Sequence, residues 1–246
     1  MELVLLHGLG GAPSDFDHLV SMLPPSWTVQ RLSLPGHGDG AQPLPAKPTL
    51  AGLGTSVASR VPARHQASSF RVAVGHSSGG IVLLDAVARG AIDCDRLVLI
   101  DSNAPLSDDG RLARSRKVAL ARSEQWRDHL LTSMAQSMGS LGLAERSRLL
   151  AGLDSTPDSV LQAIWMIVLS SDADEAWLSC LVPVLYVRTT RSVDVADAAL
   201  KRTGGALEVT VLDESLGHWP HLTAPQAVTE AIVAFVASAE HPHSRT

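Results

Sequence analysis

The chain has only two cysteines, Cys94 and Cys180, and they lie far apart in sequence. They form no CxxC pair, so their spacing argues against both a disulfide framework and a cysteine metal site. We interpret them as thiols of the core or as incidental thiols. A reducing compartment suits such residues, and a cytoplasmic location is expected.

Long hydrophobic runs are also lacking. The start of the chain has no basic leader, and its apolar run, Leu3–Leu6, ends at His7. That run is too short for a signal peptide or a membrane span, and no later stretch reaches the necessary length. The sequence therefore predicts no membrane segment and no membrane partner.

Neither sign of charge is in large excess. The formal net charge is −5 and the pI is about 6.0, which gives no broad attraction for nucleic acid. The ten histidines include no HExxH motif and no clustered ligand spacing, which argues against a metal site. We expect no nucleic-acid partner, no metal and no cofactor.

What the chain does have is a regular alternation of short apolar runs with helical patterns. Its 246 residues, 45% of them hydrophobic, suffice for one α/β domain with room for an insertion. The alternation predicts a mostly parallel sheet of about six strands with helices on both faces. The strand candidates are Leu3–Leu6, Val29–Leu34, Val72–Val74, Leu97–Ile100, Val184–Val187 and Leu207–Leu212.

The interval from Ser102 to Leu181 interrupts this alternation. It contains helical stretches, among them Arg111–Leu131, Ala144–Ala151 and Ser159–Leu169, but no convincing strand. We predict a helical cap, residues 102–181, inserted into a core formed by residues 1–101 and 182–246.

Such insertions lie over the carboxyl ends of the strands, where open α/β sheets bind ligands. Three cap residues, Trp126, Trp165 and Met166, are therefore candidates to line a substrate pocket, together with Trp219 near the end of the chain. The alternative for each cap residue is a place in the ordinary core of the cap.

The segment Gly75-His76-Ser77-Ser78-Gly79 places a serine between two glycines, where a predicted strand gives way to a predicted helix. This is the layout of a nucleophile elbow, in which strand and helix approach so closely that the flanking positions must be small. We predict Ser77 as the nucleophile. The alternative is a Gly/Ser surface turn.

A serine nucleophile needs a base, and the base needs an acid to orient it. His218 follows the last predicted strand and is our candidate base, with His221 as its competitor. Asp194, which follows the strand Val184–Val187, is our candidate acid. Asp101, directly after Leu97–Ile100, is its main alternative, and Asp197 is a third candidate.

Acyl transfer also needs two hydrogen-bond donors for the developing oxyanion. We predict the backbone N–H of Ser78, after the nucleophile, and that of Leu9 in the glycine-rich loop after the first strand. A phosphate-binding interpretation of that loop is disfavoured, because it lacks the GxGxxG spacing and no Walker lysine follows.

Four segments in order resemble the α/β-hydrolase-fold superfamily: Leu5-Leu6-His7-Gly8, Leu34-Pro35-Gly36-His37-Gly38, Gly75–Gly80, and Gly217-His218 through Ala224-Pro225. The resemblance covers nearly the whole chain. It implies a serine hydrolase without a cofactor, usually an esterase, a thioesterase or a lipase-like enzyme, with the order Ser, Asp, His.

Two features depart from the family pattern. The chain opens almost directly on the strand that carries His7-Gly8, so the two leading strands of the family are expected to be absent, as in the compact plant esterase and hydroxynitrile lyase branch. The segment Val187–Asp194 lacks the glycine usual in the acid loop, and Asp194 comes later than usual.

The leading functional hypothesis is hydrolysis of an ester or thioester of a small, mostly apolar substrate through an acyl-enzyme. A lyase that uses the same residues for proton transfer is the second hypothesis, because the cap run from Arg114 to Trp126 loosely resembles that of the menaquinone-pathway SHCHC synthase. A ligand receptor with little turnover is the third.

The basic residues from Arg111 to Arg127 are candidates to meet an anionic substrate group, a coenzyme A tail or a carrier protein. Acidic residues, Asp108, Asp109, Glu124 and Asp128, interrupt them. This mixture favours a solvated helix face.

Overall fold

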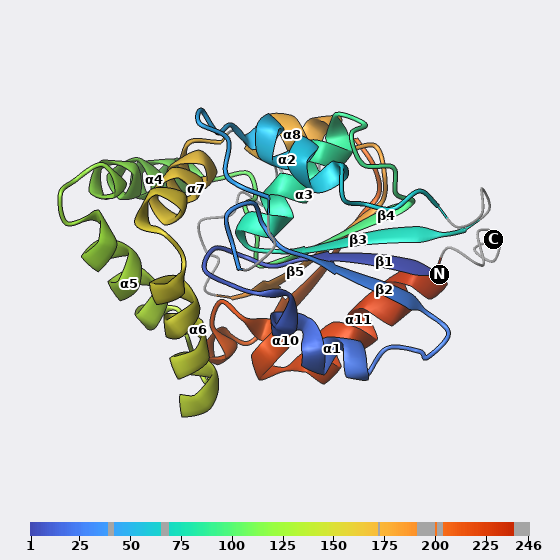
Figure 1. The fold of residues 1–246 in the computed structure, drawn as a ribbon. Helices are drawn as coiled ribbons and strands as arrows, with labels where there is room; N and C mark the ends of the chain where they lie inside the picture. The colour runs from blue at the N-terminus through green and yellow to red at the C-terminus, as the bar shows by residue number, and fades with distance from the viewer. Residues whose placement is uncertain (39–41, 65–68, 172, 191–199, 201–203, 239–246) are drawn as a thin grey trace.

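Within the residues that the computed structural model describes (1–38, 42–64, 69–171, 173–190, 200 and 204–238), six strands form one parallel sheet (Figure 1). The strand order is β2-β1-β3-β4-β5-β6. The strands are β1 (Glu2–Leu6), β2 (Thr28–Leu32), β3 (Arg71–His76), β4 (Arg96–Ile100), β5 (Val184–Thr189) and β6 (Leu207–Leu212). The predicted six-stranded α/β architecture is confirmed.

The strands have their apolar character because helices cover the sheet on both faces. Every residue of β1, β3 and β4 is buried, whereas the edge strands β2 and β6 are partly exposed. Alternate residues of β1 serve different cores: Val4 and Leu6 belong to one buried cluster, Leu3 and Leu5 to the other.

The two layers of helices are well separated in Figure 1. One face carries α2 (Leu50–Ala58), α3 (Ser78–Ala88) and α8 (Ala173–Ser179). The other carries η1 (Pro13–Phe16), α1 (Asp17–Ser21), α10 (Pro220–Thr223) and α11 (Pro225–Ala237). No helix in these described ranges is long and apolar enough to cross a membrane.

Between β4 and β5 the chain leaves the sheet and forms four helices, which lie beyond the carboxyl ends of the strands (Figure 1). We call them the inserted helices: α4 (Asp108–Ala121), α5 (Trp126–Gln136), α6 (Leu143–Ser155) and α7 (Asp158–Ser170). The helix α8 that follows packs on the sheet through the buried Trp177. The boundaries of the cap, residues 102–181, stay a prediction.

One predicted helical stretch is divided in the structure. The expected run Arg111–Leu131 ends at Ala121 and resumes at Trp126. In the break, the Ser123 hydroxyl donates to the carbonyl of Leu120, 2.8 Å away. Serine side chains compete for backbone groups in this way, which favours helix ends over helix interiors.

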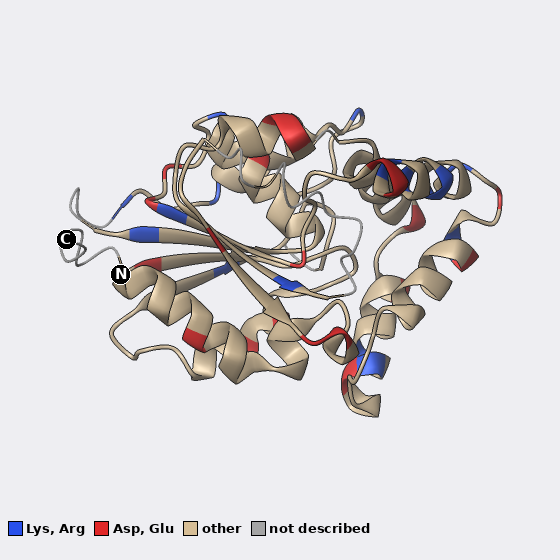
Figure 2. Ribbon diagram, turned by 180° about the vertical axis from the view of Figure 1, so that it is seen from behind, with Lys and Arg blue, Asp and Glu red and all other residues tan. Residues whose placement is uncertain are grey.

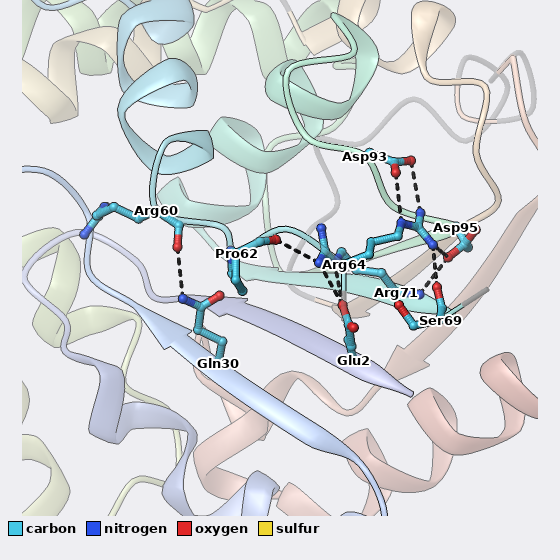
Figure 3. A network of polar contacts seen from close by, with 9 residues as sticks. All are labelled: Glu2, Gln30, Arg60, Pro62, Arg64, Ser69, Arg71, Asp93 and Asp95. Atoms are coloured by element: carbon cyan, nitrogen blue, oxygen red, sulfur yellow. Dashed lines mark hydrogen bonds and ion pairs between the residues drawn. The ribbon is translucent and has the colours of Figure 1, made fainter. Parts of the chain in front are cut away.

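At the amino ends of the strands, ion pairs link β1, β3 and the segment before β4 (Figure 3). Arg71 Nη2 lies 2.7 Å from Glu2 Oε2, and both side chains are buried. Arg64 pairs with Asp93 and Asp95, and the Asp95 carboxylate accepts the N–H of Arg71 at 2.6 Å. This network lies at the end of the sheet opposite the site described below.

Candidate active site

Ser77 lies at the sharp turn between β3 and α3, with φ 51° and ψ −120°. Few residues other than glycine adopt a positive φ, so the turn holds this serine under strain. A Cβ atom on Gly75 would lie 2.5 Å from the Cα of Gly80, and one on Gly79 would lie 2.3 Å from the carbonyl oxygen of His7. The two glycines of the predicted elbow are therefore required by the close approach of strand and helix.

The imidazole of His218 lies directly beside this serine. Its Nε2 is 2.7 Å from Ser77 Oγ. The backbone of His218 is fixed on both sides: its N–H donates to the carbonyl of Ser137 at 2.7 Å, and its own carbonyl lies 2.7 Å from Nε2 of His76. His218 is thus held between the inserted helices and the elbow.

Two glycines make this contact with the inserted helices possible. The turn after α5 contains Gly139 with φ 52°, and the His218 loop contains Gly217 with φ 69°. A Cβ on Gly139 would lie 2.5 Å from the nitrogen of Gly217. The two backbones therefore touch at a position where no side chain fits.

The other nitrogen of His218 meets a carboxylate. Nδ1 lies 2.7 Å from Oδ2 of Asp101, whose side chain is only 4% exposed. Asp101 follows β4 directly and has φ 42°, while its N–H donates to the carbonyl of Val187 at 2.7 Å. Ser77, His218 and Asp101 thus form one continuous chain of hydrogen bonds.

The sequence analysis favoured Asp194 as the acid and kept Asp101 as its alternative; in the described residues, the carboxylate that contacts His218 is that of Asp101. The physical reason is adjacency: β4 pairs directly with β3, so a side chain at the carboxyl end of β4 lies close to the elbow. Asp194 and Asp197 lie outside the described residues.

His221, the competing candidate base, is not at the serine. It is fully buried, with its ring centroid 5.2 Å from that of Phe16 and 4.4 Å from that of His76. Burial lowers the pKa of His221 to about 4, so the ring is neutral at neutral pH. We assign it a packing role behind the elbow.

The loop after β1 is held by the loop after β2 and by α6. The N–H of Gly10 donates to Nε2 of His37 at 3.0 Å. A Cβ on Gly10 would lie 2.3 Å from Cδ2 of Leu153, and the α6 residue Arg148 pairs with the buried Asp15. These contacts fix the backbone that carries Leu9.

A cavity of about 200 Å³ opens beside Ser77 and His218. The candidate oxyanion residues Leu9 and Ser78 both line it, as does Trp165. The other described residues of its lining are Asn103, Leu106, Gly110, Ala113, Arg114, Lys117, Ser133, Met134, Ser137, Val168 and Leu169.

Three predicted pocket residues lie elsewhere. Trp126 packs against the larger buried cluster, and Trp219 is buried with Met138, Leu141 and Leu149, its ring centroid 5.0 Å from that of His218. Met166 follows Trp165 on α7 and does not line the cavity, because successive residues of a helix point in directions about 100° apart.

The sequence analysis did not single out a face of α4 that lines this cavity. Gly110, Ala113, Arg114 and Lys117 recur at the i, i+3, i+4, i+7 spacing of one helical face. That spacing is visible in the sequence, but the arginines and acidic residues around it obscure the pattern.

Comparison with known proteins identifies the family of this chain. A model of the alpha/beta hydrolase family matches residues 3–231. The chain belongs to this family. A pimeloyl-[acyl-carrier protein] methyl ester esterase of Aromatoleum aromaticum is 36% identical over 103 residues, which cover 42% of this chain and 37% of that relative. The match thus spans well under half of either protein.

Several solved structures share the fold over nearly the whole chain. A hydrolase from Oleispira antarctica has a TM-score of 0.78 at 14% identity, over 96% of this chain and 90% of that one. A thermophilic esterase from Thermogutta terrifontis has a TM-score of 0.72 at 17% identity, over 97% and 90%. At such low identity, the likeness concerns the fold alone.

Proposed function

We propose that this member of the family is a serine esterase that hydrolyses a carboxylic ester through an acyl-enzyme. The observation that carries the proposal is the hydrogen-bonded chain from Ser77 Oγ through His218 to Asp101, with 2.7 Å at each link. A serine hydroxyl is a weak nucleophile at neutral pH, and this arrangement is the one that activates it.

In the first half of the reaction, Ser77 Oγ attacks the ester carbonyl carbon while His218 Nε2 takes the hydroxyl proton. Asp101 accepts the Nδ1–H bond, which orients the ring and stabilises the imidazolium. The tetrahedral intermediate collapses, the alcohol leaves with the proton from His218, and the acyl group stays on Ser77.

In the second half, His218 removes a proton from water, the hydroxide attacks the acyl carbon, and Ser77 leaves with the proton returned by His218. In both halves negative charge develops on the former carbonyl oxygen. The N–H groups of Leu9 and Ser78 are the proposed donors for it. Both residues line the cavity with Ser77, and Ser78 begins α3, where backbone N–H groups have no partner within the helix.

The apolar side chains of the cavity, such as Leu106, Trp165 and Val168, would hold the hydrocarbon part of the substrate. The relatives named as pimeloyl-[acyl-carrier protein] methyl ester esterases favour an oxygen ester over a thioester. A cytoplasmic location remains part of the proposal, since it rests on the use of cysteine.

An active-site fluorophosphonate probe tests this function. Wild type should be labelled, whereas Ser77→Ala and His218→Ala should not, because the probe reacts only with an activated serine. Hydrolysis of matched oxygen esters and thioesters with short and medium acyl chains should then show preference for the oxygen ester.

Absence of labelling in the wild type would overturn the hydrolase mechanism. Labelling without hydrolysis of any ester would instead favour the lyase or the receptor. A higher kcat/KM for the thioesters would make the protein a thioesterase.

A further inference from the structure

His76 lies at the end of β3, directly before the candidate nucleophile, and its side chain is buried. Its Nε2 atom is 2.7 Å from the backbone carbonyl oxygen of His218. A carbonyl oxygen only accepts hydrogen bonds, so the imidazole of His76 must carry a proton on Nε2 and donate it. The backbone of the candidate base therefore fixes the position of this proton.

The other ring nitrogen of His76 makes no such bond. Nδ1 is buried and has no hydrogen-bond partner in the part of the chain that the structure describes. It faces the loop after β1, where a Cβ atom on Gly8 would lie 3.0 Å from it. Burial, together with the neighbouring rings of His221 and His218, lowers the pKa of His76 well below 6.5. The ring is therefore neutral at neutral pH and presents a single donor, the Nε2–H.

The strands around His76 keep their charged residues away from it. Figure 2 shows this charge at the amino ends of the sheet, where Glu2 begins β1, Arg71 begins β3 and Arg96 begins β4. The other residues of these three strands are buried and include no Lys, Arg, Asp or Glu. A hydrogen bond in such surroundings is electrostatically stronger than one in water. The bond from His76 is thus well placed to hold a backbone in position.

Two consecutive residues at the end of β3 contact His218 at two different atoms. His76 bonds to its carbonyl oxygen, and Ser77 Oγ lies 2.7 Å from its Nε2. The N–H of Ser77 donates to the carbonyl of Ile100 at 3.0 Å, which ties the same turn to β4. The separation of nucleophile and base is therefore set within one short, closed circuit of bonds.

We propose that His76 is a positioning residue, whose Nε2–H holds the carbonyl of His218 and thereby keeps His218 Nε2 within reach of Ser77 Oγ. This inference rests on the proposed esterase function. His76 is not among the described residues that line the cavity, so it acts on the base and not on the substrate. Loss of the donor should therefore lower kcat and leave KM nearly unchanged.

Two substitutions of His76 separate the donor from the packing of the ring. His76→Phe keeps a buried ring and removes the donor, so kcat and the rate of labelling by the fluorophosphonate probe should fall about tenfold to a hundredfold, as expected for a displaced catalytic group. His76→Gln supplies an amide N–H in place of the imidazole N–H and should recover most of this loss. A purely structural role predicts the reverse order, because phenylalanine suits apolar surroundings better than an amide does.

His221→Phe is the matched control. The ring centroids of His221 and His76 lie 4.4 Å apart and both side chains are buried, but neither nitrogen of His221 has a partner among the described residues. This variant should keep the kcat of the wild type. Thermal unfolding checks the fold of each variant, and His76→Leu, a smaller substitution, replaces His76→Phe if the latter does not fold. A wild-type kcat without the donor, or an equal loss in His221→Phe, would overturn the inference while the esterase function stands.

Crystal structures of the same variants separate the two proposals if the probe does not label the wild type, a result that would overturn the esterase function. They measure the position of the base without any turnover. The distance from Ser77 Oγ to His218 Nε2 should exceed about 3.2 Å, the limit of hydrogen-bond reach, in His76→Phe. It should stay within that limit in His76→Gln and His221→Phe. An unchanged distance in His76→Phe overturns the role of His76.

Discussion

The backbone of Asp101 adopts an energetically unfavourable conformation, and this conformation directs its carboxylate to His218. Its φ of 42° lies in the left-handed region, which costs a non-glycine residue about 1–3 kcal/mol at such sites. The hydrogen bond of its N–H with Val187 and the contact of its side chain with His218 compensate for this cost. Aspartate tolerates this region better than most residues, so the residue type suits both the geometry and the proposed role.

We expect Asp101→Asn to lower kcat by about a thousandfold to ten-thousandfold, because an amide at this position favours the wrong tautomer of the histidine. Esterase assays of Asp101→Asn and Asp194→Asn, with thermal unfolding to check the fold, measure this. Asp194→Asn serves as the comparison and should stay active. If Asp194→Asn alone loses activity, the assignment of Asp101 is refuted.

At the scale of elements, the turn after α5 supports the loop that carries His218. Gly139 and Gly90 both have positive φ values, 52° and 70°. A Cβ on Gly139 would meet the backbone of Gly217, whereas one on Gly90 would find no atom within 4 Å. The two glycines therefore offer a matched pair, in which only one contacts the candidate site.

Gly139→Ala should lower kcat at least tenfold, an estimate of roughly 1.4 kcal/mol or more in the barrier, because the clash displaces the His218 loop. Gly90→Ala should reduce stability by roughly 1 kcal/mol, the cost of a left-handed alanine, and leave kcat unchanged. Steady-state kinetics and urea unfolding of both variants measure the difference. Equal kcat values would show that the turn does not position the base.

Features that depend on residues close in sequence can be predicted from the sequence, whereas those that depend on the order of the strands cannot. Buried strands such as Arg71–His76 and Arg96–Ile100 can be predicted from their apolar composition. The elbow can also be predicted, because its glycines are required by backbone contacts between residues close in sequence. The partner of His218 depends on which strand lies beside the elbow. Strand order is a property of the whole sheet, so Asp101 was only the alternative.

At the scale of the whole molecule, several neutral histidines are buried at the carboxyl end of the sheet. Burial lowers the pKa of His7, His37 and His221 to about 4, and it lowers that of His76 well below the usual value of 6.5. Because these histidines resist protonation when folded, the unfolded chain binds more protons between pH 6.5 and 4. Their contribution to stability is complete above pH 6.5 and is lost as the pH falls toward 4.

The free energy of unfolding should therefore decrease as the pH falls through this window, by up to about 1.4 kcal/mol per pH unit for each such histidine. His37→Gln retains a donor and an acceptor for Pro35 and Gly10, the partners of His37, but cannot titrate. In this variant, the unfolded chain should take up about one proton fewer relative to the folded protein, so the free energy of unfolding should decrease less steeply with falling pH. Urea unfolding at a series of pH values gives both slopes, and identical slopes would contradict the prediction.

The contact of His218 with the carbonyl of Ser137 also bears on how this protein can be recombined. The inserted helices could be exchanged for those of a relative in order to change specificity. Here the segment also holds the backbone of the proposed base. A chimera that exchanges α4–α7 must therefore conserve the turn at 137–139. Without this turn, the exchange would displace His218 and lower activity as well as change the substrate preference.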